Sequence, residues 1–383
     1  MLLDNLFSDE THVLSLEERQ KLLYNQFGIL SNPFPSAAPQ TSEHPHKSTE
    51  ADKSVDDAVK TFYFERKSHV LAVTASQGIG KTNLLNAYEK ALREKLYPRG
   101  FFLIRYVADP EPSFEPLMRS VFEWLGKDYL YRSIEALAAR QDQAEELLGF
   151  ARTGEVKAML KAFLQAEKTS KEKLNLRVSL AYEWLLGFPV RKAHKEELDI
   201  YFRLDTVESK TRVLRDIVYL GYEMKTLEGL FILLDELEKP GISFSKTSIL
   251  RYLAALRALI DALPKYLFLM VALTTDALNR YREMNPAIKG RLAHEVTLLP
   301  LRSATEGIEL CHFYLEHAQQ KAHSFAQSKK WRAGNTALVE EGEMKKIFNQ
   351  LSECSTIEGI RQRDYLQALS EKANEVFTDA IPS

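Results

Sequence analysis

One short segment combines the residue types and the spacing that binding of a phosphate ester requires. It reads Ala75-Ser76-Gln77-Gly78-Ile79-Gly80-Lys81-Thr82 and matches the phosphate-loop pattern G-x-x-x-x-G-K-[ST], with alanine in place of the first glycine. Glycines let the main chain curl around a triphosphate with its N–H groups turned inward. Lys81 would place a positive charge on the β and γ phosphates, and the Thr82 hydroxyl would bind magnesium. The segment therefore predicts a site for ATP and Mg²⁺.

The context of this loop is also the one that the motif requires. An apolar, β-branched run at 69–75 precedes it, and a helical pattern at 82–96 follows, so that the N-terminal amides of a helix would face the same anion. A chance match in an ordinary loop is the alternative, and this context makes it the weaker one. The residues predicted to contact the nucleotide are Ala75, Ser76, Gln77, Gly78, Ile79, Gly80, Lys81, Thr82 and Asn83.

A second segment is an apolar strand pattern that ends in two acids. Residues 229–235 read GLFILLD, and Glu236 follows. We expect Asp235 to hold the magnesium together with Thr82, and Glu236 to orient and deprotonate the attacking water. The alternative is a buried strand followed by a solvated acidic turn. With a phosphate loop upstream, the pattern favours Lys81, Asp235 and Glu236 as catalytic residues.

Two threonines are weaker candidates. Thr274 and Thr275 stand at the end of the strand pattern 266–274. One reading has them contact the γ-phosphate or the attacking water. The other reading has them cap the helix that follows, which is an ordinary role for threonine.

Three arginines are candidates of the same rank. Arg291 precedes a short strand pattern at 294–301. It would act either as an arginine finger on the γ-phosphate of a neighbouring subunit or as a surface salt bridge. Arg363, with Arg361 as its substitute, would either fold onto the phosphates from C-terminal helices or belong to a charged helix face.

The elements that must position these residues form an α/β pattern. Strand patterns at 69–75, 101–108, 229–235, 266–274 and 294–301 are separated by helical patterns. The span from the phosphate loop to the acid pair far exceeds the roughly 30 residues of one βαβ unit, and its residues 114–225 have helical periodicity. We therefore predict a three-layer α/β P-loop NTPase core with a helical insertion and a C-terminal helical lid, with nucleotide at the carboxyl ends of the strands.

The predicted organisation divides the chain into four parts. They are 1–53, an N-terminal helix and Pro-rich connector; 54–113 with 226–302, the ATPase core; 114–225, the helical insertion; and 303–383, the lid. The stretch that begins with FGILSNPF is rich in Pro, Ser and Thr and is predicted to be an extended connector or a surface loop. Ser54 is predicted to cap a helix over 54–66.

Composition sets limits on the setting of the protein. The 383 residues are 45 % hydrophobic and 27 % charged, as in ordinary globular proteins. No apolar run reaches the roughly 18 residues of a membrane span, and the N-terminus lacks a signal-peptide pattern. The two cysteines have no metal-type spacing, so we expect a cytoplasmic protein without a membrane partner. The net charge of −2 gives no support for a general phosphate-binding surface. The basic stretches 168–177 and 191–198 leave DNA as an open partner.

The order of these parts resembles that of AAA+ ATPases, particularly the origin-recognition/Cdc6-like and STAND-type branches. The resemblance rests on the imperfect phosphate loop, the LLDE sequence at 233–236, the threonine-ended strand, Arg291 and Arg363. It covers 62–301 as a core and 303–383 as a lid. It implies ATP and Mg²⁺ as ligands and self-association through the nucleotide interface.

A finer resemblance concerns residues 179–241, which are similar to the ATP-binding proteins of BREX-type phage-defence systems. In that family a Trp-Leu-x-Gly-x-Pro element, here 184–189, precedes an LLDELE sequence. Residues 363–369 resemble the family's R-E-F-L-x-A-L lid helix, which favours Arg363 over Arg361. Residues 27–34 are similar to the lead-in of bacterial AAA ATPases of transposition and secretion.

These observations predict an ATP-driven switch or motor subunit of a DNA-directed complex, with partner proteins, in anti-phage defence. ATP would close the lid on the core and build a subunit interface completed by Arg291. A second hypothesis is a nucleotide-dependent scaffold or sensor with slow hydrolysis, which recruits a partner protein through the helical insertion. A third is a transposition-type ATPase regulator that assembles on DNA.

Overall fold

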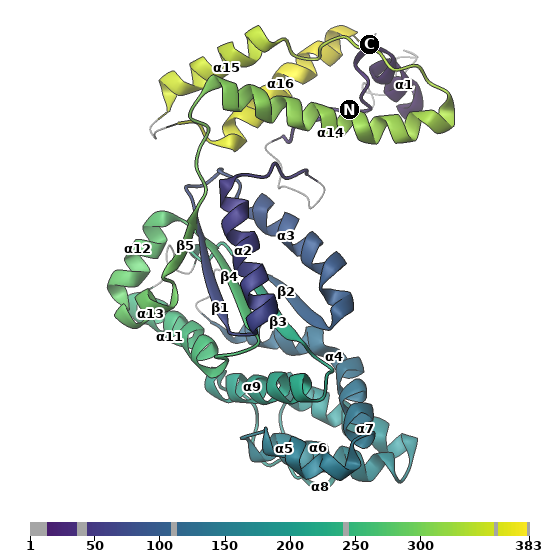
Figure 1. The fold of residues 1–383 in the computed structure, drawn as a ribbon, viewed down its shortest axis with the longest axis vertical. Coiled ribbons are helices and arrows are strands. Elements are labelled where there is room, and N and C mark those ends of the chain that lie inside the picture. Colours follow the sequence, from purple (N-terminus) through teal and green to yellow (C-terminus); the bar gives the residue numbers. More distant parts are fainter. Residues whose placement is uncertain (1–13, 37–43, 109–112, 240–244, 356–358, 381–383) are drawn as a thin grey trace, which may run out of the picture. The chain divides into compact units, whose positions relative to one another are not determined.

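The computed structural model describes residues 14–36, 44–108, 113–239, 245–355 and 359–380. The chain forms two compact units (Figure 1). The first, here called the sheet unit, comprises Thr49–Ala75 and Leu84–Thr297. The second, here called the C-terminal unit, comprises Met1–Ser48, Ser76–Asn83 and Leu298–Ser383. The phosphate loop is therefore grouped with the C-terminal unit, although the chain joins it on both sides to elements of the sheet unit.

A five-stranded parallel sheet forms the centre of the sheet unit. Its strands are β1 (His69–Thr74), β2 (Phe101–Val107), β3 (Gly229–Asp235), β4 (Leu267–Leu273) and β5 (His294–Thr297), in the order β2-β3-β4-β1-β5. The first four agree with the predicted patterns to within one residue at either end. The fifth ends at Thr297 instead of residue 301. Because all pairs are parallel, every carboxyl end lies at one edge of the sheet.

Helices cover both faces of this sheet, as a parallel sheet requires. On one face lie α2 (Glu50–Glu65) and α3 (Lys81–Lys95) (Figure 1). Phe62 of α2 is fully buried against the rings of three strands, with Phe231 of β3 at a centroid distance of 5.1 Å. On the other face, alternate strand residues such as Ile104 and Ile232 join one hydrophobic cluster with α4 (Glu115–Ala138), α9 (Val207–Glu223) and α11 (Lys246–Ala262). The predicted three-layer α/β core is thus confirmed.

The described residues between β2 and β3 form helices joined by loops and contain no strand, as predicted for residues 114–225. After α4 come α5 (Ala144–Gly149), α6 (Gly154–Glu167), α7 (Lys171–Leu185) and α8 (Lys192–Leu198), and α9 returns the chain to β3. Short 3-10 turns stand at Tyr97–Arg99 and Gln141–Gln143. The apolar sides of these helices belong to the same hydrophobic cluster as one face of the sheet. Between β4 and β5 lie α12 (Thr275–Met284) and α13 (Pro286–Arg291).

The C-terminal unit is helical. Its elements are α1 (Leu16–Phe27), α14 (Ala304–Lys329), α15 (Glu341–Cys354) and α16 (Gln362–Ala380). Of the two alternatives for the segment that starts at Phe27, the surface loop is wrong for Ile29 and Phe34, whereas residues 28–34 form no helix or strand, as expected of a connector. Ile29 and Phe34 are buried in the core of this unit, and the Phe27 ring lies 6.0 Å from that of Phe377. Ile29 and Phe34 thus belong to the same hydrophobic core as residues of α14, α15 and α16. Residues 1–13 of the predicted N-terminal segment lie outside the described residues.

The start of α2 also differs from the prediction. The helix begins at Glu50 after Thr49, and Ser54 lies inside it. The Asp52 carboxylate accepts the Thr49 N–H at 2.6 Å and the Thr49 hydroxyl at 2.9 Å. This capping of Thr49 by Asp52 places the helix start one turn earlier than a Ser54 cap would. None of the helices in the described ranges has the length and apolar character of a bilayer-spanning helix.

Candidate nucleotide site

The phosphate loop follows β1 directly and ends where α3 begins at Lys81. Gly78 and Gly80 have φ values of +81° and +112°, in the left-handed region that glycine adopts without steric cost. The φ angle of Ala75 is not positive. Alanine is therefore compatible with the position where the pattern has its first glycine. The backbone has the curled form that a phosphate cradle needs.

The loop lies against the first residues of α16, within the C-terminal unit. The Arg363 N–H donates to the Gly78 carbonyl at 3.0 Å. A Cβ atom added to Gly78 would lie 3.3 Å from Arg363 Cβ and 3.4 Å from Arg361 Cδ. The two predicted lid arginines are thus next to the loop. Gln362 was not among the predicted site residues. Its Oε1 lies 3.1 Å from the position that a Cβ atom added to Gly80 would take.

The remaining loop residues differ in exposure. Lys81 is buried, and its Nζ donates to the Ser76 carbonyl at 3.4 Å. Ile79 is buried, Thr82 is half-buried, and Ser76 and Gln77 are exposed. Asn83 contacts the chain ahead of α2: its amide donates to the Pro45 carbonyl at 3.2 Å, and its Oδ1 lies 2.6 Å from His46 Nδ1.

Asp235 ends β3 as an almost fully buried carboxylate. Its Oδ2 accepts from Arg105 of β2 at 2.6 Å, and its Oδ1 accepts the Glu236 N–H at 2.9 Å. Arg105 also lies 3.8 Å from Glu89 of α3, while its Nη1 is buried and has no partner among the described residues. A buried carboxylate requires such compensation. Sequence reasoning missed Arg105, although a single arginine in the apolar run 101–108 was a detectable signal.

Glu236 has an unusual backbone conformation. Its φ is +54°, which costs a residue other than glycine about 1–2 kcal/mol. The turn is held from both sides, because the Leu237 N–H donates to the Ala272 carbonyl at 3.1 Å and Tyr281 donates its hydroxyl to the Leu237 carbonyl at 2.8 Å. The Glu236 carboxylate is half-exposed and forms an ion pair with Lys239. Such enforced conformations concentrate at functional sites.

Thr274 and Thr275 lie at the carboxyl end of β4, on the same sheet edge as Asp235. The Thr274 hydroxyl accepts the Ala277 N–H at 3.3 Å and so caps α12. Thr275 is the exposed first residue of that helix. The capping alternative therefore describes Thr274, and a contact of either threonine to a phosphate stays a prediction.

Arg291 ends α13, just before the amino end of β5. It lies on the sheet edge opposite the one where Asp235 ends β3. Its guanidinium donates from Nε to Asp261 Oδ1 at 3.0 Å and from Nη2 to Asp261 Oδ2 at 3.2 Å. This is the salt-bridge alternative, and Asp261 also pairs with Arg257. A finger role for Arg291 stays a prediction.

Comparison with known proteins found no matching family model and no matching curated protein. Among solved structures, the chain is similar to the ADP form of the Aeropyrum pernix ORC2 protein, with 13 % identity over 85 % of this chain and 70 % of that chain and a TM-score of 0.36. The ADPNP–ADP complexes of the same protein match with 13 % identity over 84 % and 66 % of the two chains and a TM-score of 0.35. Likenesses of this size carry no conclusion about function.

Proposed function

We propose that this protein is an AAA+-like ATPase, which binds ATP with magnesium and hydrolyses the nucleotide. The observation that carries the proposal is the conformation of the phosphate loop. Two left-handed glycines, Gly78 and Gly80, curl the main chain directly after β1, and Lys81 opens the following helix. A nest of N–H groups followed by a lysine and a hydroxyl is suited to a triphosphate and its metal.

The proposed roles of the residues follow from their chemistry. The loop N–H groups and Lys81 bind the phosphates, while Thr82 and Asp235 would hold the magnesium. The metal, when bound, neutralises charge on the transferred phosphoryl group. Glu236 accepts a proton from the attacking water. Support comes from the sheet, because β1 and β3 both end at its carboxyl edge.

The start of α16 is proposed to complete the phosphate contacts. Arg361 and Arg363 flank the Gly78 position, and arginine binds phosphate oxygens with two parallel N–H groups. The lid function of the C-terminal helices rests on this proximity and on the family resemblance of residues 363–369.

The wider role that we propose is a switch or motor subunit of a DNA-directed complex in anti-phage defence. This wider role is supported by the resemblance of residues 179–241 to BREX-type ATP-binding proteins. The fold itself does not contribute to it. DNA and partner proteins therefore enter as proposed partners.

A specific observation favours a second candidate, a scaffold or sensor that hydrolyses ATP slowly. The Glu236 carboxylate is engaged with Lys239 through one oxygen, and this ion pair competes with the attacking water for the carboxylate. A protein that keeps this pair closed would retain ATP and hydrolyse it rarely.

The decisive experiment measures ATP binding and turnover of the intact protein with and without duplex DNA. We expect Lys81→Ala to lose binding, because it removes a charge-assisted phosphate contact. Glu236→Gln should bind ATP normally and hydrolyse it at least about 100-fold more slowly. Glu283→Gln, an exposed acid of α12, is the matched control.

Each outcome decides between the candidates. Turnover stimulated by DNA supports the DNA-directed switch. Negligible turnover with retained ATP supports the scaffold. Normal hydrolysis by Glu236→Gln would refute the role given to Glu236, and undiminished ATP binding by Lys81→Ala would refute the site itself.

A further inference from the structure

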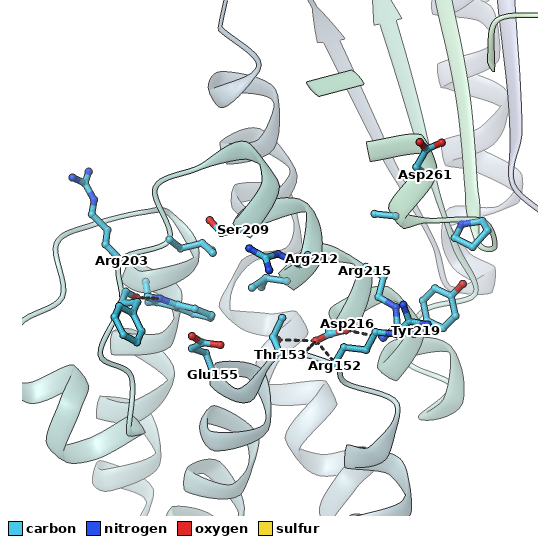
Figure 2. A pocket seen from close by; sticks show the side chains of 16 residues that line it. Arg152, Thr153, Glu155, Arg203, Ser209, Arg212, Arg215, Asp216, Tyr219 and Asp261 are labelled. Carbon is cyan, nitrogen blue, oxygen red and sulfur yellow. Dashed lines mark hydrogen bonds and ion pairs between the residues drawn. The ribbon is translucent and has the colours of Figure 1, made fainter. Parts of the chain in front are cut away.

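The sheet unit contains a cavity of about 610 Å³, formed largely by the helical insertion and separate from the phosphate loop (Figure 2). Its lining comes from three stretches that are far apart in the sequence: residues 152–155, residues 202–219, and residues 261–264 between α11 and β4. Trp184 of α7 adds to the wall. The volume lies in the range typical of small-molecule sites, roughly 300–1,000 Å³.

The walls of this cavity are held in place by Asp216, a carboxylate with no solvent exposure. Its Oδ2 accepts the N–H groups of Arg152 and Thr153 at 2.9 and 2.7 Å and the Thr153 hydroxyl at 2.7 Å. Its Oδ1 accepts from Arg215 at 2.7 Å, and the Arg215 guanidinium lies 4.2 Å from the centre of the Tyr219 ring. Figure 2 shows this network along one side of the cavity. The site is therefore built before any ligand enters.

Several charges of the lining are already balanced. Arg215 is paired with Asp216, and Asp261 is paired with Arg291 and Arg257 outside the cavity. Arg203 also lines the cavity, but its Nε donates to the Gly187 carbonyl at 2.8 Å and its guanidinium points away in Figure 2.

Among the remaining charged residues of the lining, two are arginines and one is a glutamate. Arg152 and Arg212 make no ion pair within the part of the chain that the structure describes, and Glu155 stands against them. Arg212 lies centrally among the labelled side chains in Figure 2. Both arginines are exposed to solvent at the cavity, and a guanidinium without an acidic partner can bind an anion through two parallel N–H groups.

The uncharged part of the lining includes the hydroxyl residues Thr153, Ser209 and Tyr219 and several apolar side chains. Trp184, Leu204 and Val213 contribute, and the Trp184 indole N–H is satisfied by the Phe202 carbonyl at 3.0 Å. The hydrogen bond of the indole is therefore met inside the protein, and with 2 % exposure Trp184 offers a ligand only a small part of its surface. Glu155 and Asp261 on the same walls disfavour a polyanion such as nucleic acid.

We propose that this cavity binds a small organic anion, a phosphate or a carboxylate carried on an apolar or aromatic body. Arg212 is its main charged contact, because a guanidinium binds either group with two parallel N–H bonds. The apolar body lies against Trp184. The proposal is independent of the ATPase assignment, since no residue of the phosphate loop takes part.

The tryptophans of the chain make a local test available. The sequence has three, Trp124, Trp184 and Trp331, so that a Trp124→Phe/Trp331→Phe protein carries its only indole in the cavity wall. Its fluorescence is titrated with phenyl phosphate and with phenylacetate, and benzyl alcohol serves as the neutral control. We expect a saturable change with at least one of the two anions and none with benzyl alcohol.

Variants then locate the effect. In this background Arg212→Ala should raise the Kd at least about tenfold, the loss expected for one hydrogen-bonded charge. Arg119→Ala, an exposed arginine of α4 outside the lining, should leave the Kd unchanged. Lys81→Ala should also leave it unchanged, which separates this cavity from the phosphate loop. Far-UV circular dichroism confirms that each variant is folded.

Three results would overturn the proposal. The first is that neither anion changes the fluorescence. The second is that Arg212→Ala has the same Kd as the protein with only the two tryptophan substitutions, and the third is saturable binding of benzyl alcohol. A fourth arm uses the acidic peptide acetyl-Asp-Phe-Glu-amide. Binding of this peptide together with failure of both small anions would replace the small molecule by a segment of a partner protein.

Discussion

Asp235 and Arg105 form the best-defined charge pair near the proposed chemistry. The carboxylate is 2 % exposed and the guanidinium 12 %, at a distance of 2.6 Å. At this depth, removing one partner leaves an uncompensated charge in a poorly solvated place. Arg105 thus acts as a positioning residue for the acid that would hold the magnesium.

A substitution of Arg105 tests this pairing at the level of one residue. Arg105→Met should lower the free energy of unfolding by about 3–5 kcal/mol, and Mg²⁺ without nucleotide should restore part of that loss by taking over the charge on Asp235. The measurement is urea unfolding with and without Mg²⁺. Arg93→Met is the matched control, because the Arg93–Glu89 pair is more exposed and should contribute less than about 1 kcal/mol. Equal losses in the two variants would contradict the prediction.

At the scale of elements, α2 is attached to the sheet through Phe62. This ring has no solvent exposure, whereas Phe64 on the same helix is 79 % exposed. Phe62→Ala should therefore destabilise the protein by about 3–5 kcal/mol, and Phe64→Ala by less than about 0.5 kcal/mol. Thermal or urea unfolding of the two variants provides the comparison, and similar losses would show that α2 does not pack as described.

The two cysteines report on the helices of the C-terminal unit. Burial in α14 raises the pKa of the Cys311 thiol to about 12, while Cys354 at the end of α15 is exposed. At pH 8 the native protein should therefore react quickly with a thiol reagent at Cys354 alone, because thiolate is the reactive form. Denaturant should release the second thiol. Rapid native reaction of Cys311 would show that this helical core opens readily.

The sequence predicts features that depend on neighbouring residues better than features that depend on contacts between distant segments. The strands were predicted almost to the residue because buried parallel strands are continuous apolar runs. The burial of Ile29 and Phe34 was missed, since prolines and polar residues around them resemble a loop and only the tertiary packing shows otherwise. The cavity around Arg212 was also missed, because its walls come from segments that the sequence keeps far apart.

At the scale of the whole molecule, the candidate for action between subunits is Arg291. In the isolated chain it is held by Asp261, a half-exposed pair that costs little to open. We predict that Arg291→Ala lowers ATP turnover only at protein concentrations where the protein self-associates. Arg257→Ala, which also removes a partner of Asp261, is the control. The measurement is turnover against protein concentration, and a loss of equal size at every concentration would rule out action in trans.

The bond between the Gly78 carbonyl and the Arg363 N–H joins two main-chain groups. This hydrogen bond therefore does not depend on the side chain at position 363. Every amino acid with a backbone N–H can donate it. Proline alone cannot, yet proline is tolerated in the first turn of a helix, where residue 363 stands. Apart from a change to proline, substitutions at this position can thus alter the side chain that is offered to a phosphate, while the main-chain bond between α16 and the loop is kept.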